Sequence, residues 1–234
     1  MSDAPEYRQP RFTPPPGACE LLLVRHGESA PARPERPFPL VDGHGDPPLD
    51  PNGVAQAELV ADRLIASGEE IAAIYVTSLR RTHETAAPLA GRLGLEVRVE
   101  RDLREVHLGE WEGGEFRRRV AEGDPVAVRM MAEQRWDVIP GAEPAEVFAA
   151  RVEAGIGRIA AAHPDQTVAV FVHGGVIGQA IALASGAARG FAFVGSDNGS
   201  ISHLVVTRDR WIVRCFNDTS HLSPTFSAAP EPPT

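Results

Sequence analysis

Three short apolar runs constrain the fold of this chain more than any other feature of its sequence. They are Leu-Leu-Leu-Val at 21–24, Ile-Ala-Ala-Ile-Tyr-Val at 71–76 and Val-Ala-Val-Phe-Val at 168–172. Continuous apolar runs of this length are typical of strands that are buried on both faces of a sheet. Helical patterns separate and follow them, at 53–66, 81–93, 116–136, 145–162 and 174–183. Strands that alternate with helices predict an α/β fold: a three-layer sandwich with helices on both faces of a mostly parallel central sheet.

The helix expected at 53–66 has the clearest local signals. Asp50 and Pro51 precede it, and this pair predicts a helix start because Asp caps backbone N–H groups and Pro fits the first turn. Gly68 follows as a stop signal. Its apolar side chains share one face in a helical projection: Val54, Ala57, Ala61, Leu64 and Ile65.

The two ends of the chain differ from its middle. Residues 1–18 are rich in Pro, and 223–234 contain mostly Pro, Ala and Ser, so we expect both ends to be disordered tails. The segment from 19 to 222 is expected to form one domain. Near its end, 201–206 and 211–216 predict a β-hairpin, which would give the sheet an antiparallel edge.

The charge balance of the chain limits its partners. Its 23 basic and 32 acidic side chains among 234 residues give a net charge of -9. This gives no support to a nucleic-acid partner or to a polybasic membrane surface. Two cysteines, Cys19 and Cys215, are too few for a disulfide scaffold, and neither a signal peptide nor a membrane span is recognisable. We therefore expect a cytoplasmic protein without nucleic-acid or membrane partners, and a homodimer stays open.

Every basic residue of the chain is an arginine, a usage that is common in GC-rich bacteria. An anion site must therefore use guanidinium or backbone N–H groups. Polar sequences follow the three apolar runs: Arg25-His26-Gly27, Thr77 to Arg81, and His173-Gly174-Gly175. Because ligands bind beyond the carboxyl ends of the strands in such sheets, we expect two histidines and at least two arginines to converge on one site.

Two imidazoles and two guanidiniums suit the chemistry of a phosphoryl group. Guanidinium forks match its oxygens, and phosphoryl transfer depends mainly on positioning and charge stabilisation. One imidazole, kept neutral by the flanking positive charges, can attack phosphorus and form a phosphohistidine, while the other holds an oxygen. A carboxylic acid must then protonate the leaving oxygen. Glu105 is the candidate for that acid, although composition alone favours a Glu-rich surface loop.

A series of motifs carries a resemblance to a known family. It opens with Leu23-Val24-Arg25-His26-Gly27-Glu28-Ser29. Five further motifs follow in order: Asp46-x-Pro48-Leu49-x-x-x-Gly53-x-x-Gln56-Ala57, Ser78-Leu79-x-Arg81-Thr82-x-x-Thr85-Ala86, Leu103-x-Glu105-x-x-x-Gly109-x-Trp111-Glu112-Gly113, Val172-His173-Gly174-Gly175, and Asn198-x-Ser200-Ile201 with Asn217-x-x-x-His221-Leu222. Between about residues 20 and 222, the chain thus resembles the histidine phosphatase (phosphoglycerate mutase-like) superfamily, phosphatase branch.

The resemblance implies a role for each matching residue. His26 is the phosphorylated nucleophile, and Glu105 is first the proton donor and then the base that activates water. The phosphoryl oxygens are bound by Arg25, Arg81, His173 and the backbone N–H of Gly174. The spacing to Thr85 and Ala86 favours Arg81 over its neighbour Arg80.

The substrate side departs from the family pattern. Many members carry an Asn a few residues after the Arg-His-Gly-Glu motif, and this chain has Ala30-Pro31-Ala32-Arg33-Pro34 there. We expect the Pro-rich loop at 30–45 to lie over the pocket mouth. The candidate substrate-binding residues are Ser29, Arg33 and His44.

The predicted function is that of a metal-independent phosphomonoesterase that acts through a phosphohistidine on a small-molecule phosphate ester and needs no cofactor. No His-Glu-x-x-His or paired Cys/His pattern supports a metal site. Three alternatives stay open: a phosphoglycerate mutase-type enzyme, a protein-phosphohistidine phosphatase and a non-catalytic binding protein. The short segment from Glu112 to Ala145 disfavours the mutase. Four arginines in that segment keep the mutase open: Arg117, Arg118, Arg119 and Arg129. For Arg118 and Arg119 the alternative is a solvated face of a helix.

Overall fold

A six-stranded sheet in the order β5-β4-β6-β1-β7-β8 forms the centre of the protein. The computed structural model describes residues 7–193 and 195–223. Four neighbouring strands are parallel: β1 (Cys19–Arg25), β4 (Ile71–Val76), β5 (Val97–Val99) and β6 (Thr167–Val172). The antiparallel hairpin of β7 (Ile201–Val206) and β8 (Trp211–Asp218) extends the sheet beside β1. The predicted mostly parallel sheet with an antiparallel edge is confirmed.

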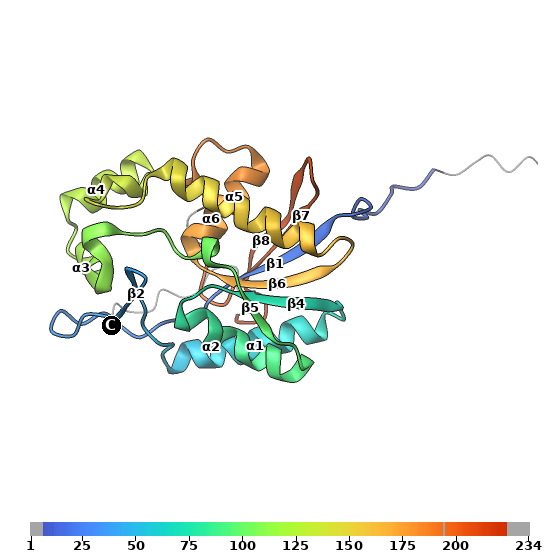
Figure 1. Cartoon of the computed structure of the whole chain (residues 1–234), viewed down its shortest axis with the longest axis horizontal. Coiled ribbons are helices and arrows are strands. Elements are labelled where there is room, and N and C mark those ends of the chain that lie inside the picture. Colours follow the sequence, from blue (N-terminus) through green and yellow to red (C-terminus); the bar gives the residue numbers. More distant parts are fainter. Residues whose placement is uncertain (1–6, 194, 224–234) are drawn as a thin grey trace, which may run out of the picture.

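Helices cover both faces of this sheet, as predicted. On one face lie α1 (Pro51–Ala66) and α2 (Arg80–Leu93), and on the other lie α5 (Ala145–Ala162) and α6 (Gly174–Ser185), as Figure 1 shows. Successive side chains of β1 alternate between two apolar cores. Leu21 and Leu23 belong to the core shared with α5 and α6, while Leu22 and Val24 belong to the core under α1 and α2. The apolar runs are continuous because both faces are buried.

Helix α1 starts where its capping signals predicted. The side chain of Asp50 accepts a hydrogen bond from the backbone N–H of Gly53 at 3.0 Å. The predicted apolar face is partly wrong, because Val54 and Ile65 are 53% and 44% exposed. The buried face is centred further round the helix: Gly53, Ala57, Val60, Ala61 and Leu64. Val54 and Ile65 lie at the margin of that face, where solvent reaches them.

The single helix predicted at 116–136 is wrong. The chain forms α3 (Glu115–Ala121) and α4 (Pro125–Glu133) instead. Gly123 has a φ of +68° between them, and the side chain of Asp124 caps α4 by accepting from the backbone N–H of Val126 at 2.8 Å. A left-handed Gly followed by an Asp-Pro pair ends one helix and starts the next.

Short 3₁₀ helices and a small hairpin complete the fold. The 3₁₀ helices are η1 (Arg101–Leu103), η2 (Gly109–Gly114), η3 (Trp136–Val138) and η4 (Gly190–Phe193). The hairpin pairs β2 (Leu40–Val41) with β3 (His44–Gly45). The hairpin lies with α3 and α4 beyond one end of the sheet (Figure 1). Residues of η2, η3, α3 and α4 form a third apolar cluster that contains Trp111, Met130 and Ile139, and Phe191 of η4 packs against it.

The predicted tails are only partly described. Residues 7–18 contain neither helix nor strand, while 1–6 and 224–234 lie outside the described residues. The boundaries of the domain at 19 and 222 stay a prediction. Within 7–193 and 195–223, no helix has the length and apolar character needed to cross a membrane.

Candidate active site

The carboxyl ends of three adjacent strands bring the candidate residues together. His26 follows β1, His173 follows β6, and Arg81 lies in the first turn of α2, after β4. The ring centroids of the two histidines are 5.2 Å apart. The Nε of Arg81 donates to Nε2 of His26 at 3.1 Å. These contacts place the two imidazoles and one guanidinium at the sheet edge where the sequence predicted a ligand site.

His26 is held as a neutral imidazole with a lone pair on Nε2. Its Nδ1 lies 2.7 Å from the carbonyl oxygen of Gly27 and must donate, because a carbonyl only accepts. The side chain is buried, and burial together with the charges of Arg81 and Arg25 holds its pKa well below the ordinary value. A neutral ring whose unprotonated nitrogen lies beside guanidiniums is the form that a nucleophile requires.

Two glycines allow the backbone at His26 to meet α1. A Cβ on Gly27 would lie 2.4 Å from the carbonyl oxygen of Gly53, and one on Gly53 would lie 2.0 Å from that of Glu28. The N–H of Gly27 donates to Oγ1 of Thr85 at 3.0 Å, and that of Glu28 donates to Gln56 at 2.8 Å. The conformation after β1 is therefore fixed by backbone contact with α1 and by a side chain of α2.

The structure decides which of the neighbours Arg80 and Arg81 lies in the site. Arg81 is buried, its Nη1 donates to the carbonyl of Gly45 at 2.9 Å, and burial lowers its pKa to about 10, so it keeps its charge at neutral pH. Arg80 is exposed and pairs with Glu84 one turn along α2. The guanidinium in the site is thus that of Arg81.

Arg25 and His173 carry polar atoms whose hydrogen-bonding capacity is unused. Nη1 of Arg25 donates to the carbonyl of Ser196, and Nε2 of His173 lies 3.0 Å from Oγ1 of Thr77. Among the described residues, neither Nε of Arg25 nor Nδ1 of His173 has a hydrogen-bond partner. Burial, the charge of Arg81 and the neighbouring His26 lower the pKa of His173. Nε of Arg25 is thus a donor without a partner beside His26, and Nδ1 of His173 becomes a second one in the tautomer that carries its proton there.

Glu105 lies in a half-buried loop between η1 and η2, and its carboxylate is held by backbone N–H groups. One carboxylate oxygen accepts from the backbone N–H of Val106 at 2.9 Å, and the other accepts from that of Gly175 at 3.2 Å. Gly175 is the second residue of α6, directly after His173 and Gly174. The carboxyl group of Glu105 thus lies against the first turn of the helix that starts at the second histidine.

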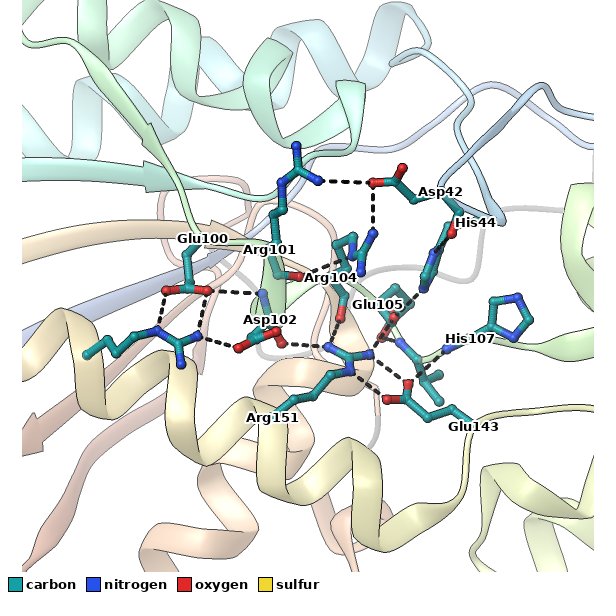
Figure 2. A network of polar contacts seen from close by, with 12 residues as sticks. Asp42, His44, Glu100, Arg101, Asp102, Arg104, Glu105, His107, Glu143 and Arg151 are labelled. Atoms are coloured by element: carbon teal, nitrogen blue, oxygen red, sulfur yellow. Dashed lines mark hydrogen bonds and ion pairs between the residues drawn. The ribbon is translucent and has the colours of Figure 1, made fainter.

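The backbone around Glu105 is held by Arg151 of α5, as Figure 2 shows. Arg151 donates to the carbonyls of Asp102, Arg104 and Glu105 at 2.6, 2.7 and 2.8 Å. Its Nε and Nη2 donate to the carboxylate of Glu143 at 2.6 and 2.8 Å. All five N–H groups of the guanidinium are therefore engaged. On the other side of the loop, Nε2 of His44 lies 3.1 Å from the carbonyl oxygen of Glu105.

Two adjoining hollows open at Arg25 and His26. The larger, of about 600 Å³, is lined by residues of the 30–45 loop, by α3 and by Asn198. The smaller, of about 350 Å³, is lined by Arg81, Glu105, His44 and a group of apolar side chains. The Pro-rich loop thus forms walls of both hollows, in agreement with its predicted place at the pocket mouth.

Comparison with known proteins identifies the family. Residues 21–219 match the histidine phosphatase superfamily (branch 1). The chain belongs to the histidine phosphatase superfamily. The match confirms the resemblance carried by the motifs, and it includes every strand of the central sheet except the first two residues of β1.

Two of the three similar proteins described next are phosphatases by name. Phosphoglycerate mutase-like protein 4 of Arabidopsis thaliana is 34% identical over 210 residues, 88% of each chain. The metal-independent phosphoserine phosphatase of the same plant is 32% identical over 211 residues, 87% of this chain and 83% of that protein. The native structure of a mycobacterial glucosyl-3-phosphoglycerate phosphatase superposes with a TM-score of 0.71 at 27% identity, covering 86% of this chain and 100% of that one. These similarities show the enzyme class, a phosphoric monoester hydrolase.

The predicted substrate-binding residues of this histidine phosphatase differ in their surroundings. Ser29 is buried, and its Oγ accepts from Nη2 of Arg117 at 2.6 Å. His44 is buried in the wall of the smaller hollow, beside Glu105. Arg33 is exposed and lines the larger hollow. All three border the hollows, and their contact with substrate stays a prediction.

The three consecutive arginines of α3 point to different places. Arg117 lines both hollows and lies over the ring of Phe38, with its guanidinium carbon 5.4 Å from the ring centroid. Arg118 pairs with Glu115 and Glu122 on α3, and Arg119 pairs with Glu115 and Asp124. These ion pairs agree with the solvated face expected for Arg118 and Arg119, although Arg118 also borders the larger hollow.

Two residues of the site received no role from the sequence. Asn198 lines the larger hollow, and its Nδ2 donates to the backbone carbonyl of His26 at 2.9 Å. Thr77 contacts His173, as described above, and follows directly after β4. The position of Thr77 at a strand end was a usable signal. In the part of the chain that the structure describes, no group of three or more His, Cys, Asp and Glu side chains could hold a metal ion.

Proposed function

We propose that this protein is a metal-independent phosphomonoesterase that acts through a phosphohistidine at His26 on a small phosphorylated metabolite. The observation that carries the proposal is the neutral His26 ring, whose Nε2 faces Arg81 beside Arg25 and His173. The guanidiniums supply the positive charge that the phosphoryl oxygens need in the transition state. One of the relatives, named as a metal-independent phosphoserine phosphatase, supports the same view.

The proposed reaction has two steps. Arg25, Arg81 and His173 hold the phosphoryl oxygens while Nε2 of His26 forms a bond to phosphorus. The bond from phosphorus to the ester oxygen breaks, and protonated Glu105 gives its proton to the departing alcohol. The Glu105 carboxylate then takes a proton from water as that water attacks phosphorus. The phosphorus–nitrogen bond breaks, phosphate leaves, and His26 and Glu105 return to their starting forms.

The surroundings of the site favour hydrolysis over the other functions. A mutase must hold a second charged group of its substrate, and Arg117, the extra guanidinium at both hollows, already donates to Ser29 and to the carbonyl of Ala30. A protein phosphohistidine needs an open mouth, whereas the 30–45 loop walls both hollows. A binding protein has no need for an acid at Glu105 that lies beside His173 and Gly175.

The test is a phosphate-release screen over phosphorylated metabolites, including phosphoserine and glucosyl-3-phosphoglycerate, with a mutase assay in parallel. We expect turnover in the presence of EDTA, inhibition by vanadate, and an acid-labile, base-stable phosphoenzyme in rapid-quench samples. The variant His26→Ala should lose both turnover and phosphoenzyme. Turnover by His26→Ala at the wild-type rate, or activity that a chelator abolishes, would contradict the proposed mechanism.

A further inference from the structure

The position of Glu105 indicates which hollow receives the leaving group, if the proposed function holds. The acid must contact the ester oxygen that departs, on the side of phosphorus opposite to Nε2 of His26. Among the described residues, Glu105 lines the smaller hollow together with His26 and Arg81, and it is not among the residues around the larger one. The alcohol part of the substrate therefore extends into the smaller hollow.

The far wall of that hollow is apolar and mostly aromatic. It consists of Phe38, Leu108, Trp111, Phe116 and Trp136. Phe116 lies between the two tryptophans, with ring centroids 6.2 Å from Trp111 and 5.9 Å from Trp136. Phe38, Phe116 and Trp136 are only partly buried, so apolar ring surface faces the hollow. Exposed apolar surface in a concave site is a mark of an apolar ligand group.

The charged groups of the hollow outside the phosphoryl site already have partners. The carboxylate of Glu112 accepts from the backbone N–H groups of Gly45 and Leu108 at 2.7 and 2.9 Å. Arg117 donates to Ser29 and Ala30 and lies over Phe38. Both ring nitrogens of His44 lie 3.1 Å from carbonyl oxygens. These polar groups are thus fixed by neutral hydrogen-bond partners of the protein, and the aromatic part of the lining offers a charged leaving group no hydrogen-bond partner in exchange for its lost hydration.

We propose that this enzyme is selective for phosphate monoesters of apolar, ring-bearing alcohols, and that Phe38, Phe116 and Trp136 form the subsite for the ring. The ring would contact aromatic edges and faces, while the ester oxygen stays beside Glu105 and the phosphoryl group stays on His26. Monoesters of small, charged alcohols would bind through the phosphoryl group alone.

The test compares two alkyl esters whose alcohols are similarly poor leaving groups, 2-phenylethyl phosphate and ethyl phosphate. We expect kcat/KM to be at least about 10-fold higher for the phenylethyl ester, since even one apolar group in a fitted pocket contributes a factor of that order. The variants Phe38→Ala and Phe116→Ala should reduce this ratio. Val128→Ala, at a 61% exposed position of α4, is the matched control and should keep it.

A binding measurement separates this inference from the proposed mechanism. The phosphonates 2-phenylethylphosphonate and ethylphosphonate have no ester bond to break, so calorimetry compares their affinities without turnover. The inference predicts at least about 10-fold tighter binding of the phenyl compound. Equal affinities, or a preference for phosphoserine or a sugar phosphate over 2-phenylethyl phosphate, would overturn it and assign the leaving group to the larger hollow. A phenyl preference without a phosphoenzyme would support the subsite and contradict the proposed mechanism.

Discussion

Gly175 stands where any larger residue would touch the proposed acid. A Cβ at this position would lie 2.4 Å from Oε1 of Glu105, and the backbone has no positive φ that would itself require glycine. The end of a flexible side chain can move away, so the fold should accept Gly175→Ala while the carboxyl is displaced. The substitution Gly175→Ala would therefore displace the carboxyl group of Glu105 without removing it.

For Gly175→Ala we expect kcat on alkyl phosphates to fall by about 100-fold, a loss typical of a catalytic group moved by about 1 Å. Esters of acidic phenols, which leave without help from an acid, should lose much less. The matched control is Gly157→Ala in α5, where nothing lies within 4 Å of the added Cβ. Steady-state kinetics on both ester types test this, and wild-type rates on alkyl phosphates would show that the Glu105 carboxyl does not act as the acid.

The sequence predicted the residues around His26 better than it predicted the residues that line the two hollows. His26, His173 and Arg81 follow strand ends, and the order of strands in a parallel sheet brings such ends together. Arg117, Arg118 and Arg119 are chemically identical neighbours. Arg117 borders both hollows, Arg118 only the larger one and Arg119 neither, and this difference depends on where α3 lies against the 30–45 loop. Asn198 contacts His26 from 172 residues away in sequence, so no local pattern could show the pair.

Among the elements, helix α5 holds the segment that carries Glu105, through one arginine. Arg151 connects three carbonyls of this segment to Glu143, whose carboxylate also accepts from the N–H of His107 at 3.2 Å. A lysine in its place would keep the charge but could not reach three carbonyls and a carboxylate with one ammonium. Arg151 is thus a positioning residue for Glu105.

We expect Arg151→Lys to lower kcat on alkyl phosphates by about 10- to 100-fold with little change in KM. Rates should also depend more steeply on the leaving-group pKa, because the acid is misplaced. Arg158→Lys is the matched control: it lies on the same helix, is 51% exposed, and pairs with Glu100 and Asp102. A merely structural role would lower the melting temperature without changing the leaving-group dependence, and that outcome would contradict the assignment.

The elements differ in how well the sequence predicted them. The short apolar runs of β1, β4 and β6 fit only strands that are buried on both faces of the sheet. The positions of these strands were predicted to within two residues at each end. The segment at 116–136 has helical periodicity on both sides of Gly123 and Asp124, so periodicity alone predicted one helix where turn chemistry makes two. Helix α5 continues through Gly155, where a Cβ would lie 2.9 Å from Leu103. That glycine allows close packing and does not end the helix.

At the scale of the whole molecule, the two buried histidines of the site should make the free energy of unfolding depend on pH. Burial and nearby positive charge hold the pKa of both His26 and His173 well below the ordinary value of about 6.5. Below pH 6.5 the unfolded chain takes up protons at these positions, while the folded protein does not. Stability contributed by the neutral rings is therefore complete above pH 6.5 and is lost as the pH falls toward the lowered pKa values.

Each histidine can contribute a slope of up to about 1.4 kcal/mol per pH unit in this range. We expect the free energy of unfolding, measured with urea, to fall between pH 6.5 and pH 5. The slope should be smaller in His26→Asn and in His173→Asn, and smallest in the double variant. A loss of packing in the variants lowers the free energy of unfolding equally at every pH, so it does not change the slope. An unchanged slope in the double variant would mean that these rings take up protons in the folded protein as readily as in the unfolded chain, which would contradict the lowered pKa of His26 and His173.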